Sequence, residues 1–374
     1  MKAAEAAPLH LGYRPPLDGL RGVAILAVMA FHGGVIRGGF LGVDLFFVLS
    51  GFLITTLLLE ERDRTGAIHL GRFYARRALR LLPALFALVI ACSIVVVLTG
   101  GPEEAGIFGS AALWVIFYLA NWASFFGYPL HVLRHAWSLA IEEQFYLLWP
   151  GLLVLLARVT ASRARLLGAV VAGVGVSVLL RLWQWVAPDA VAQLYARLDW
   201  RGDALLVGCA LGVLTTGNWL PASRTARAWL LGGSLVAAAV LAAAFLGASW
   251  DALYMRGGGA TLVALSAAAL IVQVLVAPAG WIARLLAFRP LVRTGRISYG
   301  LYLWHFPIFF ALSGLAYQSI RPALPRVLLA AVVTFLVAEA SFRFLERPLL
   351  NLKDRFRDDS RGRKAKELWR GGKR

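Results

Sequence analysis

An arginine and a histidine near the start of the chain have a spacing that could support group transfer. Arg21 and His32 are eleven residues apart, which is about 16 Å along a helix and nearly in register around it. Asp18 lies one turn before Arg21, so the three residues share one stripe of a predicted helix. Histidine serves as a general base or a nucleophile, and arginine holds anionic groups. The spacing therefore predicts a reactive site that runs along this helix.

Further ionisable and polar residues interrupt the apolar stretches of the chain. Such groups are costly in an apolar environment and are candidates for function by default. Any one of them could be a structural group satisfied by a neighbour, but several together are better explained by one shared polar cavity. With Asp18 and His32, the expected cavity residues are Asp44, Ser50, Trp137, Ser138, Glu142, Glu143, Tyr146, His305 and Glu339.

The segment 72–83 carries a second chemical feature. If it is helical, Arg72, Arg76 and Arg80 fall along one stripe with Arg77 beside them. Paired guanidinium groups suit phosphate oxygens. A basic segment next to a membrane could instead contact lipid headgroups, and the spacing alone leaves both interpretations open. The same anion could be bound by a later cluster, which consists of Arg296, Ser298 and Tyr299.

The elements that must position these residues are membrane helices. The chain has 374 residues, of which 60% are hydrophobic and only 16% are charged, against roughly 25% charged in a soluble domain. We therefore predict an all-α, polytopic transmembrane bundle with about ten helices. The expected spans are 17–36, 43–59, 82–99, 138–157, 166–186, 203–217, 228–248, 259–277, 297–317 and 326–348.

The distribution of basic residues orients this bundle. If both termini are cytoplasmic, the inner segments hold about 27 of the 38 Lys and Arg residues and the outer loops hold about six, as the positive-inside rule requires. The net charge of +18 thus reflects membrane topology, and we expect no nucleic-acid partner. The apolar stretch 107–126 is long enough to span, but a crossing there would reverse this bias downstream. We expect it to be re-entrant or interfacial.

Two parts of the chain are expected to lack catalytic chemistry. Cys92 and Cys209 both lie inside apolar runs, so neither a disulfide framework nor a cysteine-based metal site is expected. The membrane domain should cover residues 1–350. The tail 351–374 holds ten Lys or Arg residues and few apolar ones, and we expect a disordered basic segment lying against anionic headgroups.

Five short runs along the chain follow one another in a specific order. They are Leu17-Asp18-Gly19-Leu20-Arg21-Gly22 with His32, Gly42-Val43-Asp44-Leu45-Phe46-Phe47-Val48-Leu49-Ser50-Gly51, the pair Arg77 and Arg80 before Pro83, Trp137-Ser138-Leu139 with Glu142-Glu143-Gln144-Phe145-Tyr146, and Ser298-Tyr299-Gly300-Leu301-Tyr302-Leu303-Trp304-His305. Together they resemble the acyltransferase-3 family over about residues 14 to 350.

The resemblance implies a function and a set of roles. Members are ten-helix proteins of the bacterial cytoplasmic (inner) membrane that transfer acyl groups, commonly acetyl from acetyl-CoA, to cell-surface glycans, glycolipids or secreted small molecules. Arg21 and His32 match the family's arginine and histidine motif, in which the histidine is regarded as catalytic. Arg77 and Arg80 match an arginine pair tied to acyl-CoA use. Some relatives carry an appended extracytoplasmic domain, so we expect the acceptor to be handled by the membrane domain itself or by a separate extracytoplasmic partner.

The resulting hypothesis is an O-acetyltransferase that needs no metal. The phosphates of acyl-CoA would bind Arg77, Arg80 and Arg296, and Arg21 would lie beside the path of the thioester. His32 would act as base or as nucleophile, with Asp44 or Glu142 holding its ring. The alternatives are a transporter or flippase, in which the same buried groups form a relay, and a non-catalytic assembly subunit.

Overall fold

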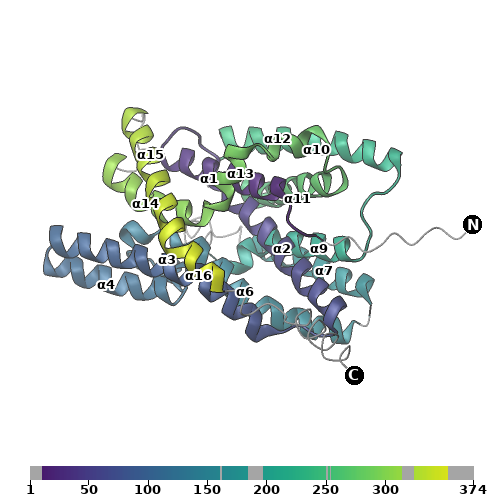
Figure 1. Ribbon diagram of the computed structural model, residues 1–374, viewed down its shortest axis with the longest axis horizontal. Coiled ribbons are helices and arrows are strands. Elements are labelled where there is room, and N and C mark those ends of the chain that lie inside the picture. The colour runs from purple at the N-terminus through teal and green to yellow at the C-terminus, as the bar shows by residue number, and fades with distance from the viewer. Residues whose placement is uncertain are drawn as a thin grey trace, which may run out of the picture.

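The computed structural model describes residues 11–160, 162–183, 197–249, 252, 254–313 and 324–352, and within these ranges it contains helices and no strands (Figure 1). The predicted all-α class is therefore confirmed. The α-helices are α1 Pro15–His32, α2 Gly42–Thr65, α3 Leu70–Thr99, α4 Pro102–Ile116, α5 Ala120–Phe125, α6 Ala136–Val159, α7 Arg163–Trp183, α9 Leu198–Thr216, α10 Arg224–Gly247, α11 Ala260–Val276, α12 Trp281–Leu286, α13 Arg289–Arg296, α14 Ser298–Ser313, α15 Leu324–Ser341 and α16 Arg347–Leu352. Short 3-10 turns lie at Gly39–Leu41 and His131–Leu133, and π-helical turns at Met255–Gly259 and Phe342–Glu346.

Seven helical segments of the described chain are long and apolar enough to cross a membrane. They are Gly39–Thr65, Leu70–Thr99, Ala136–Val159, Arg163–Trp183, Arg224–Gly247, Gly257–Val276 and Leu324–Asn351. The other three predicted spans coincide with α1, α9 and α14, which have 18, 19 and 16 residues, whereas a crossing takes about 20. The number ten, and the sides on which the termini lie, stay predictions. The predicted tail lies outside the described residues, except for 351–352.

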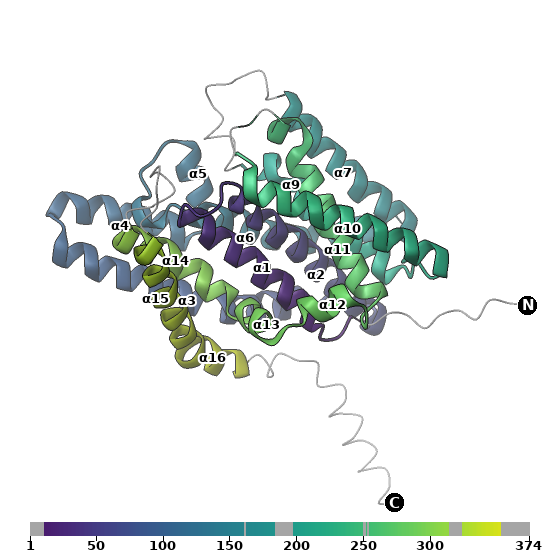
Figure 2. The same cartoon turned by 90° about the horizontal axis from the view of Figure 1, so that it is seen from above.

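Helix α1 lies in the middle of the bundle, between α2 and α13 (Figure 2). Small residues allow this close packing. A Cβ atom on Gly295 of α13 would lie 1.7 Å from the carbonyl oxygen of Asp18 on α1. A Cβ atom on Gly208 of α9 would lie 2.1 Å from the carbonyl oxygen of Val48 on α2. Close backbone approach of this kind is the usual packing mode of membrane helices, and here it fixes the helices that carry Arg21 and Asp44.

Helices α3 and α4 form an arm at one end of the bundle (Figures 1 and 2). The stretch 107–126 belongs to this arm and is divided between α4 and α5. The break lies at Tyr118, whose φ of 54° is in the left-handed region. Gln144 of α6 holds the break: its amide nitrogen donates to the Tyr118 carbonyl oxygen and to Asn121 Oδ1, both at 2.8 Å. Neither α4 nor α5 is long enough to cross a membrane alone.

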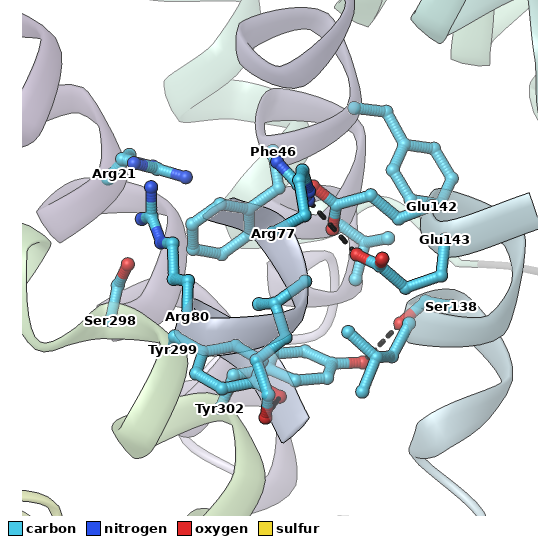
Figure 3. Close-up of a pocket in the computed structure, with 14 residues that line it drawn as sticks. Arg21, Phe46, Arg77, Arg80, Ser138, Glu142, Glu143, Ser298, Tyr299 and Tyr302 are labelled. Carbon is cyan, nitrogen blue, oxygen red and sulfur yellow. Dashed lines mark hydrogen bonds and ion pairs between the residues drawn. The ribbon is translucent and has the colours of Figure 1, made fainter. Parts of the chain in front are cut away.

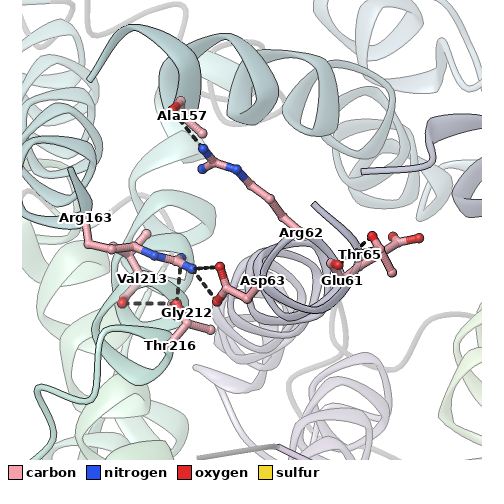
Figure 4. A network of polar contacts seen from close by, with 9 residues as sticks. All are labelled: Glu61, Arg62, Asp63, Thr65, Ala157, Arg163, Gly212, Val213 and Thr216. Atoms are coloured by element: carbon pink, nitrogen blue, oxygen red, sulfur yellow. Dashed lines mark hydrogen bonds and ion pairs between the residues drawn. The ribbon is translucent and has the colours of Figure 1, made fainter. Parts of the chain in front are cut away.

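Contacts at the ends of α2, α6, α7 and α9 bear on the number of membrane crossings between α2 and α6 (Figure 4). The Arg62 guanidinium near the end of α2 donates to the Ala157 carbonyl oxygen near the end of α6 at 3.2 Å. At the start of α7, Arg163 donates to both carboxylate oxygens of Asp63 on α2, at 2.6 and 2.5 Å, and to Thr216 on α9. The ends of α2 and α6 therefore lie on one side, which requires an even number of crossings between them. Helices α3 and α6 are long and apolar enough to supply two. The contacts thus agree with the expectation that 107–126 adds no crossing, which stays a prediction.

Candidate active site

A pocket between α1, α2, α3, α6 and α14 is lined by eight of the eighteen predicted site residues (Figure 3). It encloses about 590 Å³ of atom-free space, counting its open mouth. Its polar lining consists of Arg21, Arg77, Arg80, Ser138, Glu142, Glu143, Ser298, Tyr299 and Tyr302, and its apolar lining of Val43, Phe46, Phe47, Leu81 and Leu139. Because the lining combines charged, polar and apolar side chains, the pocket suits a long ligand with apolar and charged parts.

Arg77 is balanced by its neighbours in this pocket. Its guanidinium Nη2 donates to Glu143 Oε1 at 3.0 Å. The guanidinium carbon also lies 3.3 Å from the centre of the Tyr146 ring, a cation–π contact. Glu142 beside them accepts hydrogen bonds from Ser50 Oγ and Tyr146 Oη, each at 2.5 Å. The charge of Arg77 is thus offset by a carboxylate and a ring face before any ligand binds.

Arg21 and Arg80 differ from Arg77 in this respect. Their guanidinium groups point toward each other across the pocket (Figure 3), close enough for mutual repulsion. Within the described part of the chain, neither forms an ion pair with a carboxylate, and Arg21 Nε is buried without a hydrogen-bond partner. Two like charges held together in a low-dielectric site favour an anion between them. The geometry therefore indicates an anion-binding position.

A second pocket of about 990 Å³ of atom-free space opens beside the first. The two share Arg77, Arg80 and Tyr299, which therefore form the boundary between them. The second pocket adds Arg76, Arg296 and Glu61 among its charged residues. All seven residues predicted to bind acyl-CoA line one pocket or the other, namely Arg21, Arg76, Arg77, Arg80, Arg296, Ser298 and Tyr299.

Arg296 lies at the rim of the second pocket, just before the expected span 297–317. Its guanidinium donates to the Tyr13 hydroxyl at 3.2 and 2.6 Å, and its Nε lies 3.7 Å from Asp18 Oδ2. The Tyr13 hydroxyl and the Asp18 carboxylate raise the pKa of Arg296 above its usual value, so the side chain stays charged. Asp18 was expected in the central cavity and is found instead at this rim.

Three histidines lie together beyond the first pocket: His135 and His305 are buried, and His32 is partly buried. His305 Nε2 is 3.2 Å from His32 Nδ1, and the ring centres are 5.0 Å apart. The His135 ring packs edge-on against His305 at 5.4 Å and stacks on Phe306 at 5.0 Å. His32 Nδ1 also lies 3.0 Å from the Val28 carbonyl oxygen. The structure thus joins His32 and His305, which the sequence placed 273 residues apart.

Tyr302 connects the pocket with the histidine cluster. Its ring lines the pocket and lies 5.4 Å from the ring of His305 and 5.6 Å from that of His135. Its hydroxyl donates to the His135 carbonyl oxygen at 2.9 Å and is hydrogen-bonded to Ser138 Oγ. A group that moves from the arginines toward His32 would therefore pass this tyrosine.

Asp44 does not take the place expected for it. It was predicted to hold the His32 ring, but its carboxylate forms a fully buried ion pair with Arg201 of α9 at 2.6 Å. A second buried pair lies beside it, in which Arg181 of α7 donates to Asp203 at 2.8 Å. Thr261 of α11 is hydrogen-bonded to both members of the second pair. A buried arginine attracts the nearest carboxylate, and Asp44 therefore joins α2 to α9. Glu142, the other carboxylate expected at His32, is bound by Ser50 and Tyr146.

Two further expected cavity residues lie apart from the pocket. Glu339 of α15 pairs with Arg293 of α13 and with Arg343 at the edge of the bundle, and its side chain is partly exposed. Trp137 packs at the margin of the main hydrophobic core and lines neither pocket. Ser138, Glu142 and Glu143 line the pocket, and Ser50 and Tyr146 donate hydrogen bonds to Glu142. His32 and His305 belong to the histidine cluster. The structure therefore gathers the remaining expected residues in neighbouring positions and places Asp18, Asp44, Glu339 and Trp137 outside the expected cavity.

Some contributing residues were missed by the sequence reasoning. His135 lies just before an expected span, so it was not counted among residues at membrane depth. Tyr302 lies one turn before His305, a spacing that could have signalled a shared face. Arg181 and Asp203 stand inside apolar stretches, which is a usable signal. Glu346 lies in the π-helical turn, is buried, and lines the second pocket.

Comparison with known proteins now adds a decisive observation. Residues 15–340 match the family described as "Acyltransferase domain". The chain belongs to the acyltransferase-3 family. The predicted resemblance is thereby confirmed, together with membership in an acyltransferase class of membrane protein. No solved structure matches the chain significantly.

Named relatives lie in several bacteria. The chain is 34% identical to the "Peptidoglycan O-acetyltransferase OatA" of Listeria monocytogenes, over 90% of this chain and 56% of the relative. It is 34% identical to the "Putative peptidoglycan O-acetyltransferase YrhL" of Bacillus subtilis, over 91% and 55%. The "O-acetyltransferase OatA" of Staphylococcus aureus is 33% identical, over 90% and 57%. The chain thus spans about half the length of these relatives.

Proposed function

We propose that this protein is an O-acetyltransferase of the bacterial cytoplasmic membrane that moves acetyl from acetyl-CoA to a hydroxyl of a cell-wall glycan. The family match supports acyl transfer. The names of the relatives support acetyl as the group and peptidoglycan as the acceptor class. The domain that performs the transfer would be residues 1–350.

The observation that carries this proposal is the facing pair Arg21 and Arg80, which has no carboxylate partner among the described residues. The same pocket is lined by Tyr302, whose ring lies beside His305, the neighbour of His32. The donor has phosphates at one end and a thioester on a long, flexible arm at the other. Guanidinium forks suit the phosphates. The wall of Phe46, Phe47 and Leu139 suits the arm, so the pocket matches the donor's order of charged and uncharged parts.

The chemistry falls to His32. In the first route, one ring nitrogen takes the proton of the acceptor hydroxyl while that oxygen attacks the thioester carbonyl carbon. The carbon–sulfur bond breaks, and the leaving sulfur takes the proton from the imidazolium. In the second route, the ring nitrogen attacks the carbonyl carbon first and expels the thiolate, and the acceptor oxygen then attacks the acyl-imidazole. The acceptor's proton ends on the thiol of CoA in either route.

The test uses the full chain in lipid nanodiscs with acetyl-labelled acetyl-CoA and a soluble peptidoglycan fragment. Free CoA and labelled ester are measured together. We expect His32→Ala to reduce ester formation by roughly 10²–10⁴-fold, the usual contribution of such a group. His69→Ala is the matched control, because His69 is a half-exposed histidine beside Glu61. Unchanged ester formation in His32→Ala would refute the proposal, and acid quenching separates the two routes by trapping acyl-histidine in the second.

A further inference from the structure

The contacts of His305 restrict where the protons of the histidine cluster lie. His305 Nδ1 faces two backbone carbonyl oxygens, those of Tyr302 at 2.6 Å and Leu301 at 3.2 Å. A carbonyl oxygen only accepts, so this nitrogen must carry the proton. In neutral His305 the other nitrogen, Nε2, is then an acceptor.

The same reasoning extends to His32. His32 Nδ1 faces the Val28 carbonyl oxygen at 3.0 Å and His305 Nε2 at 3.2 Å. Both are acceptors, so His32 Nδ1 must be the donor, which leaves the lone pair on Nε2. A doubly protonated His305 would put a hydrogen against this donor, so the contacts require a neutral His305. In neutral His32 the lone pair is then on Nε2.

The surroundings hold the two rings in these positions. His305 is fully buried, and its ring contacts Phe306 and Phe309 at 6.3 and 6.4 Å. The Phe306 ring meets His32 edge-on at 5.1 Å. Val28 belongs to the same helix as His32, so its contact does not fix the position of α1 relative to α14. His305 can, because it is the contact from α14 that fixes the rotation of the His32 ring.

We infer that His305 is the positioning residue of His32, which it holds with the proton on Nδ1 so that Nε2 is the reactive atom. The statement that Nε2 reacts rests on the proposed function. The position of the proton on Nδ1 does not. The role usually given to a carboxylate beside a catalytic histidine falls here to a neutral imidazole. Either route of acyl transfer would use the same atom, since base and nucleophile both need the lone pair.

The tautomer is measured by solid-state nitrogen NMR on histidine-labelled protein in lipid. The chain has six histidines, and the His32 signals are assigned by difference from His32→Gln. We expect a protonated Nδ1 and an unprotonated Nε2. A protonated Nε2 in the wild-type protein would overturn the inference, whatever the activity.

Two substitutions at His305 separate positioning from packing. His305→Gln keeps an acceptor near the Nε2 position, whereas His305→Leu fills the space without one. We expect His305→Leu to lower transfer by roughly 10–100-fold, as loss of a supporting shell does, and to mix the His32 tautomers. His305→Gln should restore most of both. His69→Leu is the control and should alter neither readout.

The outcomes remain distinct from those of the proposed function. Equal losses in the Gln and Leu variants, with the His32 tautomer unchanged in both, would mean that His305 only fills space. A wild-type protein that forms no ester would refute the proposed activity and leave the tautomer measurement standing. Active wild-type protein with the proton on Nε2 would refute the positioning role alone.

Discussion

Two sets of buried arginines in this bundle have opposite surroundings. Arg181 and Arg201 each contact a buried aspartate, at 2.8 and 2.6 Å, and their side chains are almost completely excluded from solvent. Arg21 and Arg80 face each other in a pocket and form no ion pair within the described chain. The first set joins α2, α7, α9 and α11, whereas the second lies where α1 and α3 border the pocket.

The difference separates structure from binding. A paired buried arginine has its charge and donors satisfied by the protein, so it holds helices together. Two facing arginines without a carboxylate lower the stability of the empty protein and gain from an anion. Conspicuous charge in a membrane domain is therefore a functional signal only when the fold leaves it without a counter-ion.

The largest expected effect is at the paired set. Asp203→Ala should lower the free energy of unfolding by about 3–5 kcal/mol, because it leaves the buried Arg181 charge without its partner. Thermal unfolding in detergent, followed by tryptophan fluorescence, measures this. The double variant Arg181→Met with Asp203→Leu should recover most of the loss. Wild-type stability in Asp203→Ala would show that the pair does not hold these helices.

The next effect concerns the facing pair Arg21 and Arg80, where we expect a change in donor binding and no loss of stability. Arg80→Gln and Arg21→Gln should each raise the KM for acetyl-CoA by roughly 10–100-fold, since a hydrogen bond to a charged group contributes about 1.5–3 kcal/mol. Thermal stability without donor should stay the same or rise, because a repulsion is removed. The matched control is Arg201→Gln, which should lose stability. A loss of stability in Arg80→Gln with an unchanged KM would show that Arg80 holds helices together, as Arg201 does, and does not bind the donor.

A smaller effect is expected at Glu143, which offsets Arg77. Glu143→Gln should lower the KM for acetyl-CoA by roughly two- to tenfold, because a carboxylate near the donor's phosphates repels them. Steady-state kinetics at fixed ionic strength measure the change. Glu104→Gln on α4 carries the same charge change away from the pockets and should leave KM unaltered. A higher KM in Glu143→Gln would mean that Glu143 aids donor binding by orienting Arg77.

The smallest effect belongs to the exposed pair of Arg163 and Asp63 (Figure 4). Asp63 is 53% exposed, and exposed ion pairs contribute about 0–1 kcal/mol. Arg163→Gln should therefore shift the thermal midpoint only slightly, and high salt should remove that shift. Asp63→Asn should behave alike. A loss as large as that of Asp203→Ala would show that the helix-end contacts are cooperative.

Much of the fold and of the pocket was predictable from the chain alone. Apolar stretches indicated the helices, and each of the ten expected spans overlaps a helix of the described chain. The basic bias indicated that 107–126 adds no crossing, which the contacts of Arg62 and Arg163 support. All seven expected acyl-CoA residues line the two pockets.

The errors have one physical cause. Sequence spacing along one helix orders side chains on a stripe, as it did for Arg21 and His32, but it does not say which helix lies opposite. Asp44 was expected at His32 because it is one of the ionisable residues that interrupt the apolar stretches. Arg201, 157 residues away, is its actual partner. Glu339 was expected in the shared cavity because it stands inside an apolar stretch. It pairs instead with Arg293 and Arg343 at the edge of the bundle.

The sequence by itself determined the membrane class, the helices and the chemical types available, since these depend on composition and local periodicity. Its five ordered motifs indicated the family by resemblance. Only the tertiary structure decided which charges are neutralised and which remain for a ligand, and that His305 rather than a carboxylate contacts His32. Pairing is set by helix packing over long sequence distances, where a few ångströms separate a structural ion pair from a binding site.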